Sequence, residues 1–161
     1  MVLRGVSLFF SGLFAGLLVC VMVLENSLRS YGAAVYTQVR LVELDSLDKL
    51  ASVTLIPAIL TSVAVAIWSR GSSRRLALVA VALLVVVFVT TLAVNLPINS
   101  DQLSWSVQQP PADWAEVRDR WQVAHAIRTV AAVLAFAVLV TSAVRGREAA
   151  RPRVLAGSVV T

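Results

Sequence analysis

A stripe of aromatic and cationic side chains, which includes the chain's single histidine, precedes an apolar run near the C-terminus. Its members recur at helical spacing on one face: Trp114, Arg118, Trp121, His125 and Arg128. Tryptophan is common where helices enter a bilayer, but a histidine one turn deeper has no such use. An imidazole beside guanidinium groups can act as a general base next to cations that stabilise a developing anion.

A glutamate at the end of the first apolar run requires a partner. Glu25 follows the uncharged stretch at residues 5–24 and lies on the same side of a bilayer as His125. A bare charge at membrane depth costs about 2.5–3.5 kcal/mol on the insertion scale, and the helix dipole disfavours an anion at a C-terminus. Unless Glu25 frays into water, we expect His125, Glu25 and Arg128 to form a catalytic set in which Glu25 tunes the histidine.

Further polar residues on the same side are predicted to bind a substrate. Amide and guanidinium groups could hold an enolate or oxyanion, and the set comprises Asn95, Asn99, Arg118, Trp121 and Glu43. Alternatively, His125 with Glu25 or Glu43 could ligate a metal ion. Copper and iron usually take more than one histidine, and the chain has a single one, which counts against a site for these metals. The sequence therefore predicts either no cofactor or a single metal ion.

Four apolar segments must position these residues. The 161-residue chain is 58% hydrophobic and 14% charged, with a mean hydropathy of +0.83, which is too apolar for an ordinary soluble domain. A transmembrane helix takes about 20 residues, and the predicted spans cover residues 5–24, 50–68, 76–95 and 121–144. The sequence therefore predicts an all-α bundle of four transmembrane helices, within one domain over residues 1–161.

The connection between the first two spans is predicted to be a helical, extracytoplasmic segment. Residues 33–47 place several apolar side chains on one face, among them Val35, Val39 and Val42. This pattern suits either an amphipathic helix on the outer surface or an extension of the second span.

The connection before the fourth span contains signals that stop and start helices. Pro97 follows Asn95 closely, and because proline cannot continue a helix, we expect the third span to end at Asn95. Asp113 and Glu116 have the spacing of a capping box, which predicts that the fourth helix starts there, outside the bilayer.

Charge asymmetry predicts the orientation. One set of eight arginines falls at the N-terminus, the second connection and the C-terminus: Arg4, Arg70, Arg74, Arg75, Arg145, Arg147, Arg151 and Arg153. The other connections hold eight of the nine acidic residues. The positive-inside rule therefore places both termini in the cytoplasm of a plasma-membrane protein. Residues 145–161 are then a basic cytoplasmic tail that contacts lipid phosphates rather than nucleic acid, and a single cysteine excludes an intramolecular disulfide.

The residues around the fourth span resemble the anthrone oxygenase-like family of small four-helix membrane proteins, long labelled a domain of unknown function. The resemblance is carried by an Asn-x-Pro-x-Asn motif, a following tryptophan and an Arg-Trp-x-x-x-His-x-x-Arg motif: Asn95, Pro97, Asn99, Trp105, Arg120, Trp121, His125 and Arg128. It implies an oxygenase that works without flavin or haem on a reduced polycyclic aromatic. In such a reaction an acidic anthrone C–H loses its proton to a base, and the carbanion gives an electron to O₂.

Three classes of function remain open at this level. The first is this monooxygenase, whose partners are the bilayer and a hydrophobic small molecule. The second is a non-catalytic membrane module that binds a lipid, a quinone or a partner protein through the same outer pocket. The third is a transporter or channel, which four spans could build as a homo-oligomer. An enzyme should gather its polar residues in a closed pocket with an entrance from the lipid side.

Overall fold

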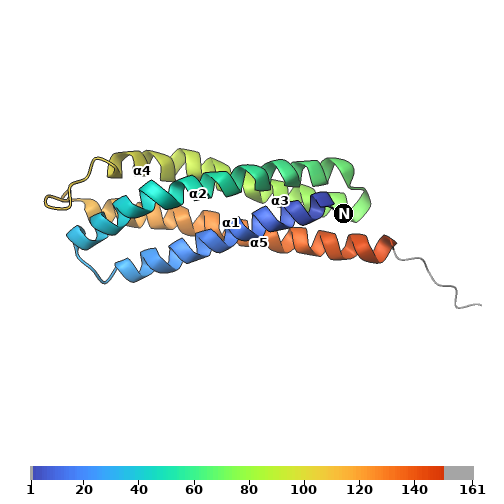
Figure 1. Cartoon of the computed structure of the whole chain (residues 1–161), viewed down its shortest axis with the longest axis horizontal. Helices are drawn as coiled ribbons and strands as arrows, with labels where there is room; N and C mark the ends of the chain where they lie inside the picture. Colours follow the sequence, from blue (N-terminus) through green and yellow to red (C-terminus); the bar gives the residue numbers. More distant parts are fainter. Residues whose placement is uncertain (1, 151–161) are drawn as a thin grey trace, which may run out of the picture.

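The chain folds into an elongated bundle of antiparallel helices (Figure 1). The computed structural model describes residues 2–150, with side chains up to residue 145. Its elements are α1 (Val2–Leu28), α2 (Ala33–Trp68), α3 (Gly71–Thr90), the π-helical turn η1 (Thr91–Asn95), α4 (Leu96–Gln102) and α5 (Trp114–Ala150). Of the predicted tail, residues 145–150 continue α5, and residues 151–161 lie outside the described residues.

Within the described residues, four helices are long and apolar enough to cross a membrane: Val2–Leu28, Ala33–Trp68, Gly71–Gln102 and Trp114–Arg145. Large apolar side chains such as Phe9, Leu60, Ile67 and Val130 are more than half exposed on the outside of the bundle. Such a surface is unfavourable in water, whereas a lipid environment accepts it. The predicted all-α fold with four spans is confirmed, and it is consistent with an integral membrane protein.

The core combines large side chains from α1 and α3 with small ones from α5. Phe14 and Leu18 of α1 and Leu84 of α3 pack against the alanines of α5, of which Ala132 and Ala135 are almost fully buried. Small residues let helix backbones approach closely. The close approach brings the first half of α5 against α1, where the candidate site lies.

The predicted helix in the first connection is an extension of the second span, because α2 runs unbroken for 36 residues. Tyr36, Arg40 and Glu43 lie on its buried face, whereas Val35 and Val42 are exposed. The alternative of a separate amphipathic helix on the outer surface is therefore wrong. Here the valines face outward and the polar face turns into the bundle, which is the reverse of the usual arrangement of a helix in water.

The prediction that the third span ends at Asn95 is also wrong. The π-helical turn η1 follows α3, and α4 continues the helix to Gln102. Pro97 falls in the first turn of α4, directly after Leu96, whose backbone N–H bonds to the carbonyl of Thr91 five residues earlier. A π-helical turn adds a residue to the turn and is common at functional sites. As the capping-box pattern predicted, α5 starts directly after Asp113, whose carbonyl accepts from the backbone N–H of Val117.

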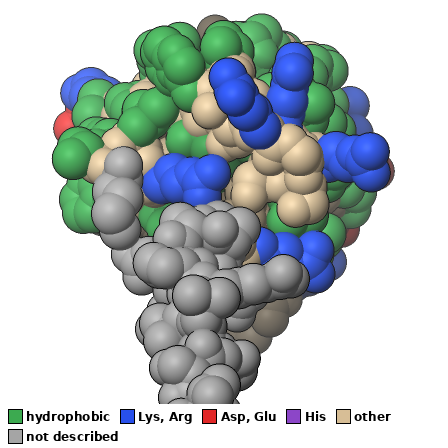
Figure 2. Space-filling model, turned by 90° about the vertical axis from the view of Figure 1, so that its right-hand side faces the viewer, with side chains coloured by type: hydrophobic (Ala, Val, Ile, Leu, Met, Phe, Trp, Pro, Cys, Tyr) green, Lys and Arg blue, Asp and Glu red, His purple; other side chains and the backbone are tan. Residues whose placement is uncertain are grey.

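The N-terminus, the α2–α3 connection and the far end of α5 lie at one end of the bundle, and the other two connections lie at the opposite end (Figure 1). The first end therefore carries Arg4, Arg70, Arg74, Arg75 and Arg145. Figure 2 looks onto this end and shows basic side chains around it, with few acidic ones.

Candidate functional site

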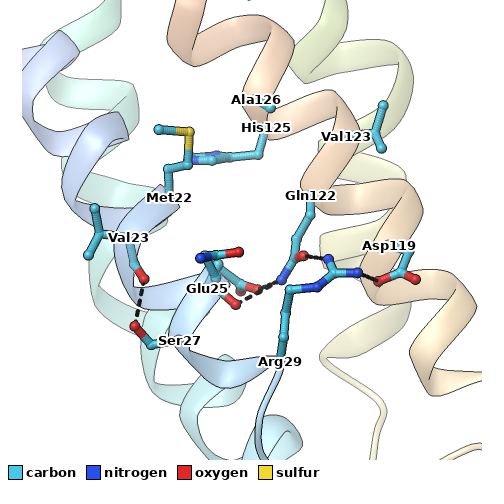
Figure 3. Close-up of a pocket in the computed structure, with 11 residues that line it drawn as sticks. Met22, Val23, Glu25, Ser27, Arg29, Asp119, Gln122, Val123, His125 and Ala126 are labelled. Atoms are coloured by element: carbon cyan, nitrogen blue, oxygen red, sulfur yellow. Dashed lines mark hydrogen bonds and ion pairs between the residues drawn. The ribbon is translucent and has the colours of Figure 1, made fainter.

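A cavity of about 650 Å³ lies between the second half of α1 and the first half of α5 (Figure 3). Ligand sites for small molecules commonly measure about 300–1,000 Å³. Its walls, here called the α1–α5 groove, comprise Met22, Val23, Glu25, Asn26, Ser27, Arg29, Asp119, Gln122, Val123, His125 and Ala126. Val23 and Val123 are mostly exposed on the outside of the bundle. The groove therefore opens sideways, with these apolar residues on one part of its rim and the exposed polar residues Asn26, Ser27 and Arg29 on another.

A chain of polar contacts crosses one end of the groove and ends at Glu25 (Figure 3). Arg29 pairs with Asp119 at 3.1 Å and donates a hydrogen bond to Oε1 of Gln122. The amide nitrogen of Gln122 in turn donates to Oε2 of Glu25 at 3.0 Å and to the backbone carbonyl of Glu25 at 2.9 Å. These contacts fix the Glu25 carboxylate between α1 and α5.

Glu25 is buried, with 1% of its surface exposed, and does not fray into water. On the side away from Gln122, its Oε1 lies 3.5 Å from Nη1 of Arg40. The need for a cationic partner, predicted from its place at the end of α1, is met by Arg40 of α2. It is not met by direct contact with His125 or Arg128.

Arg40 is the centre of a buried polar network, here called the Arg40 cluster. Its guanidinium donates to Glu43 at 2.6 Å, to Asn99 at 2.7 Å and to Gln102 at 2.9 Å. Glu25 completes the set, and all five side chains are less than 5% exposed. Buried charges are stable only when such partners satisfy them. The cluster thus ties α1, α2 and α4 together beside the groove.

The two motif asparagines connect this cluster to α5. Asn99 accepts from the indole N–H of Trp121 at 2.7 Å and donates to Asp48 at 3.0 Å. Asn95, in η1, donates to the backbone carbonyl of Trp121 at 3.3 Å. The guanidinium carbon of Arg40 lies 3.9 Å from the centre of the Trp121 ring, as in a cation–π contact. Of the predicted substrate-binding residues, Asn95 and Asn99 therefore both contact Trp121, behind the groove.

His125 lies between the groove and these buried residues. Its ring is stacked on that of Trp121, with 4.7 Å between the two ring centres. Arg128 donates to Nδ1 of His125 from Nη2 at 2.8 Å, and Nε2 lies 2.9 Å from the carbonyl oxygen of Leu18. Because Nδ1 accepts, we infer that the proton is on Nε2 and is donated to Leu18. Both ring nitrogens are engaged, so His125 can take a proton only if one of these bonds breaks.

Arg128 does not reach the surface, since only 5% of it is exposed. Besides His125, it contacts the hydroxyl of Thr91 in η1 at 3.4 Å. No carboxylate of the described residues lies within 4.0 Å of it. Its guanidinium carbon instead lies 5.5 Å from the centre of the Trp121 ring.

Of the two remaining residues that were predicted to bind a substrate, Glu43 lines a cavity and Arg118 does not. Glu43 joins the Arg40 cluster and lines an inner cavity of about 20 Å³, together with Asp48, Trp121, His125 and Arg128. A cavity of this size is large enough for one water molecule, for which about 10–15 Å³ suffices. Arg118 pairs with Asp119 at 2.9 Å and lies over the Trp114 ring, away from the lining of either cavity.

The predicted metal ligands do not fit a metal ion in this arrangement. Among the described residues, no three histidine, cysteine, aspartate or glutamate side chains are placed to hold one. Both nitrogens of His125 have other partners, and Glu25 contacts Arg40 and Gln122.

Residues that the sequence did not single out complete the site. Arg40, Gln102, Gln122 and Arg29 each contribute a contact described above, although none belongs to a recognisable motif. A signal for Arg40 was present in its spacing, because Tyr36, Arg40 and Glu43 share one helical face.

Replacing His125 by alanine should lower the free energy of unfolding by about 2 kcal/mol or more, because two buried hydrogen bonds are lost, one of them to a cation. This exceeds the effect of about 1 kcal/mol that is usual for a single substitution. Val123→Ala, on the exposed face of the same helix, is the matched control. Thermal unfolding in detergent measures both, and equal midpoints would contradict the contacts described for His125.

A family model described as "Anthrone oxygenase" matches residues 47–138, more than half of the chain. The matched segment covers most of α2, all of α3, η1 and α4, and the part of α5 that carries Trp121, His125 and Arg128. No curated protein and no solved structure gives a significant match to the chain.

Proposed function

Since the chain belongs to the anthrone oxygenase family, we propose that it is a membrane-embedded oxygenase that acts on a reduced polycyclic aromatic of the anthrone type. The observation that carries this proposal is the α1–α5 groove, which is large enough for a multi-ring molecule and has a buried carboxylate in its wall. A hydrophobic substrate would enter it from the bilayer, through the opening flanked by Val23 and Val123.

In the proposed reaction, Glu25 removes a proton from the acidic CH₂ group of the substrate. Its Oε2 accepts one hydrogen bond, from Gln122, whereas a carboxylate oxygen has two lone pairs. The carbanion transfers one electron to O₂, and the resulting radical and superoxide combine to a peroxide anion. This anion recovers the proton from Glu25, and the hydroperoxide loses water to give the ketone. One O₂ is consumed for each ketone and each water formed.

The other residues position the base and compensate charge. Gln122 and Arg40 hold the Glu25 carboxylate from its two sides. His125 forms the wall between the groove and the cationic interior, and Arg128 fixes its tautomer. The arginines stabilise the negative charge that passes from carbon to oxygen, because a low-dielectric site strengthens such interactions. We place His125 and Arg128 in this supporting role and the base function on Glu25.

Filling the groove should weaken substrate binding while leaving the fold intact. Met22 of α1 and His125 of α5 both line the groove (Figure 3), and Met22→Trp would occupy space that the substrate needs. We expect KM to rise by about tenfold or more, which corresponds to a loss of roughly 1.4 kcal/mol of binding. Val19→Trp, one turn earlier on α1 and outside the groove, is the control. Equal KM values for the two variants would place the substrate elsewhere.

We further propose that the protein resides in the plasma membrane with both termini in the cytoplasm, which the arginine-rich end supports. In a Cys20→Ala background, a cysteine at Leu103 should react with a membrane-impermeant maleimide on intact cells. A cysteine at Ser72, at the opposite end of the bundle, should react only after lysis. Labelling of position 72 but not position 103 on intact cells would invert the topology.

A further inference from the structure

We propose that Glu25 and Glu43 share a single proton, so that the two carboxyls act as one unit at the wall of the groove. The role of this pair in turnover rests on the proposed function, whereas the shared proton itself does not. Nothing in the family motif includes either residue, and the pair forms only because the first part of α2 turns its polar face inward against α1.

The two carboxyls meet at one nitrogen atom. Nη1 of Arg40 lies 2.6 Å from Oε2 of Glu43 and 3.5 Å from Oε1 of Glu25. Two carboxylates that are both ionised this close to one nitrogen atom repel each other, and a proton on one of them removes this repulsion. An ionised carboxylate only accepts hydrogen bonds, so only a protonated glutamate can donate one to the other.

Unpartnered oxygen atoms lead to the same conclusion. Oε2 of Glu25 accepts from Gln122 and Oε2 of Glu43 accepts from Arg40, but neither Oε1 has a hydrogen-bond donor. Both side chains are more than nine-tenths buried. Buried polar atoms in proteins are rarely left without a partner. One proton held between the two glutamates makes a donor of one and gives the other its missing partner.

The charge balance of the surroundings favours the same proton. The ionisable side chains that face the pair come from α2 and α5: Tyr36, Arg40, Asp48, His125 and Arg128. From α4, the amides of Asn99 and Gln102 face it. With Tyr36 and His125 neutral, the region holds two positive charges, on the arginines, and three negative charges, on Glu25, Glu43 and Asp48. A buried region tolerates an uncompensated charge poorly, and one shared proton makes the cluster neutral.

In the proposed reaction, the pair would allow charge to be balanced at each step. At rest the shared proton leaves one negative charge on the two glutamates. When Glu25 takes a second proton from the substrate, the cluster gains one positive charge, which balances the carbanion and then the peroxide anion. Return of that proton to the peroxide restores the resting pair. Glu43 is therefore a positioning residue that keeps the region around Glu25 neutral.

Infrared spectroscopy of the full-length protein in nanodiscs at neutral pH tests the shared proton without any substrate. We expect a band from the carbonyl stretch of a buried, protonated carboxylic acid. Its frequency should shift when the side-chain carboxyl carbons of glutamate are labelled with carbon-13. Glu25→Gln and Glu43→Gln should each abolish it, because the remaining glutamate then faces Arg40 alone and ionises. Glu116→Gln, at an exposed position on α5, should leave it unchanged.

Absence of the band from the wild-type protein, which needs no variant to fold, would overturn the proposal. So would survival of the band in either Glu25→Gln or Glu43→Gln, because the proton would then belong to one residue. The band and the turnover can fail separately. A protein with the band but without oxygenase activity would retain the shared proton and contradict the proposed function.

Discussion

Replacing Glu25 by glutamine should lower the turnover of an anthrone by about 100-fold or more, the contribution expected of a general base. Glutamine has nearly the same shape and still offers an oxygen to Gln122, but it cannot take up a proton. Arg40 retains its 2.6 Å contact with Glu43, so the Arg40 cluster should stay folded. The loss should therefore appear in kcat and not in the amount of folded protein.

The measurement is the conversion of an anthrone to its quinone by purified protein in nanodiscs, corrected for spontaneous oxidation. Glu116→Gln makes the same chemical change at an exposed site of α5 and should have no effect. If Glu25→Gln remains active while His125→Ala is inactive although folded, the base is His125, and its bonds to Arg128 and Leu18 must open during turnover.

Replacing Arg40 by leucine should destabilise the protein by about 3–5 kcal/mol, the usual cost of removing one partner from a buried ion pair. Glu25 and Glu43 would lose their shared cation, and Asn99 and Gln102 would each lose a donor. Few single substitutions in this chain should cost as much, because no other cation of the described residues contacts two carboxylates that are both buried.

Arg29→Leu is the matched control for this change. Arg29 also pairs with a carboxylate, but both partners are almost half exposed, and such surface pairs contribute about 1 kcal/mol or less. Unfolding in detergent by heat or denaturant compares the two variants. Similar stabilities for Arg40→Leu and Arg29→Leu would mean that the Arg40 cluster does not hold the bundle together.

The sequence predicted the four spans and part of the site, because the relevant signals are local. Trp121, His125 and Arg128 recur at helical spacing in one segment, and all three side chains do turn into the bundle. The same spacing places Arg118 on the stripe, and it is buried too, but it lies over the Trp114 ring and pairs with Asp119 instead of lining a cavity. Helical spacing gives a direction around the axis but does not show which side chains of the neighbouring elements a residue contacts.

Local patterns do not predict the position of Arg40, because the usual rule for a helix in water buries an apolar face such as that of Val35 and Val42. In this structure that face is exposed and Arg40 turns inward. The contacts of Glu25 with Arg40 and Gln122 join residues far apart in the chain, so no local pattern predicts them. Pro97 was read as a helix stop because the compensating π-helical turn has no clear sequence signature.

The most direct test of the proposed function is O₂ uptake by the wild-type protein in nanodiscs on addition of an anthrone. We expect protein-dependent uptake above the spontaneous rate, with one O₂ consumed for each quinone formed. An anthrone that binds in the groove and protects it from labelling, but is oxidised no faster than in empty nanodiscs, would contradict it. That outcome would identify the protein as a membrane module that binds hydrophobic molecules without transforming them.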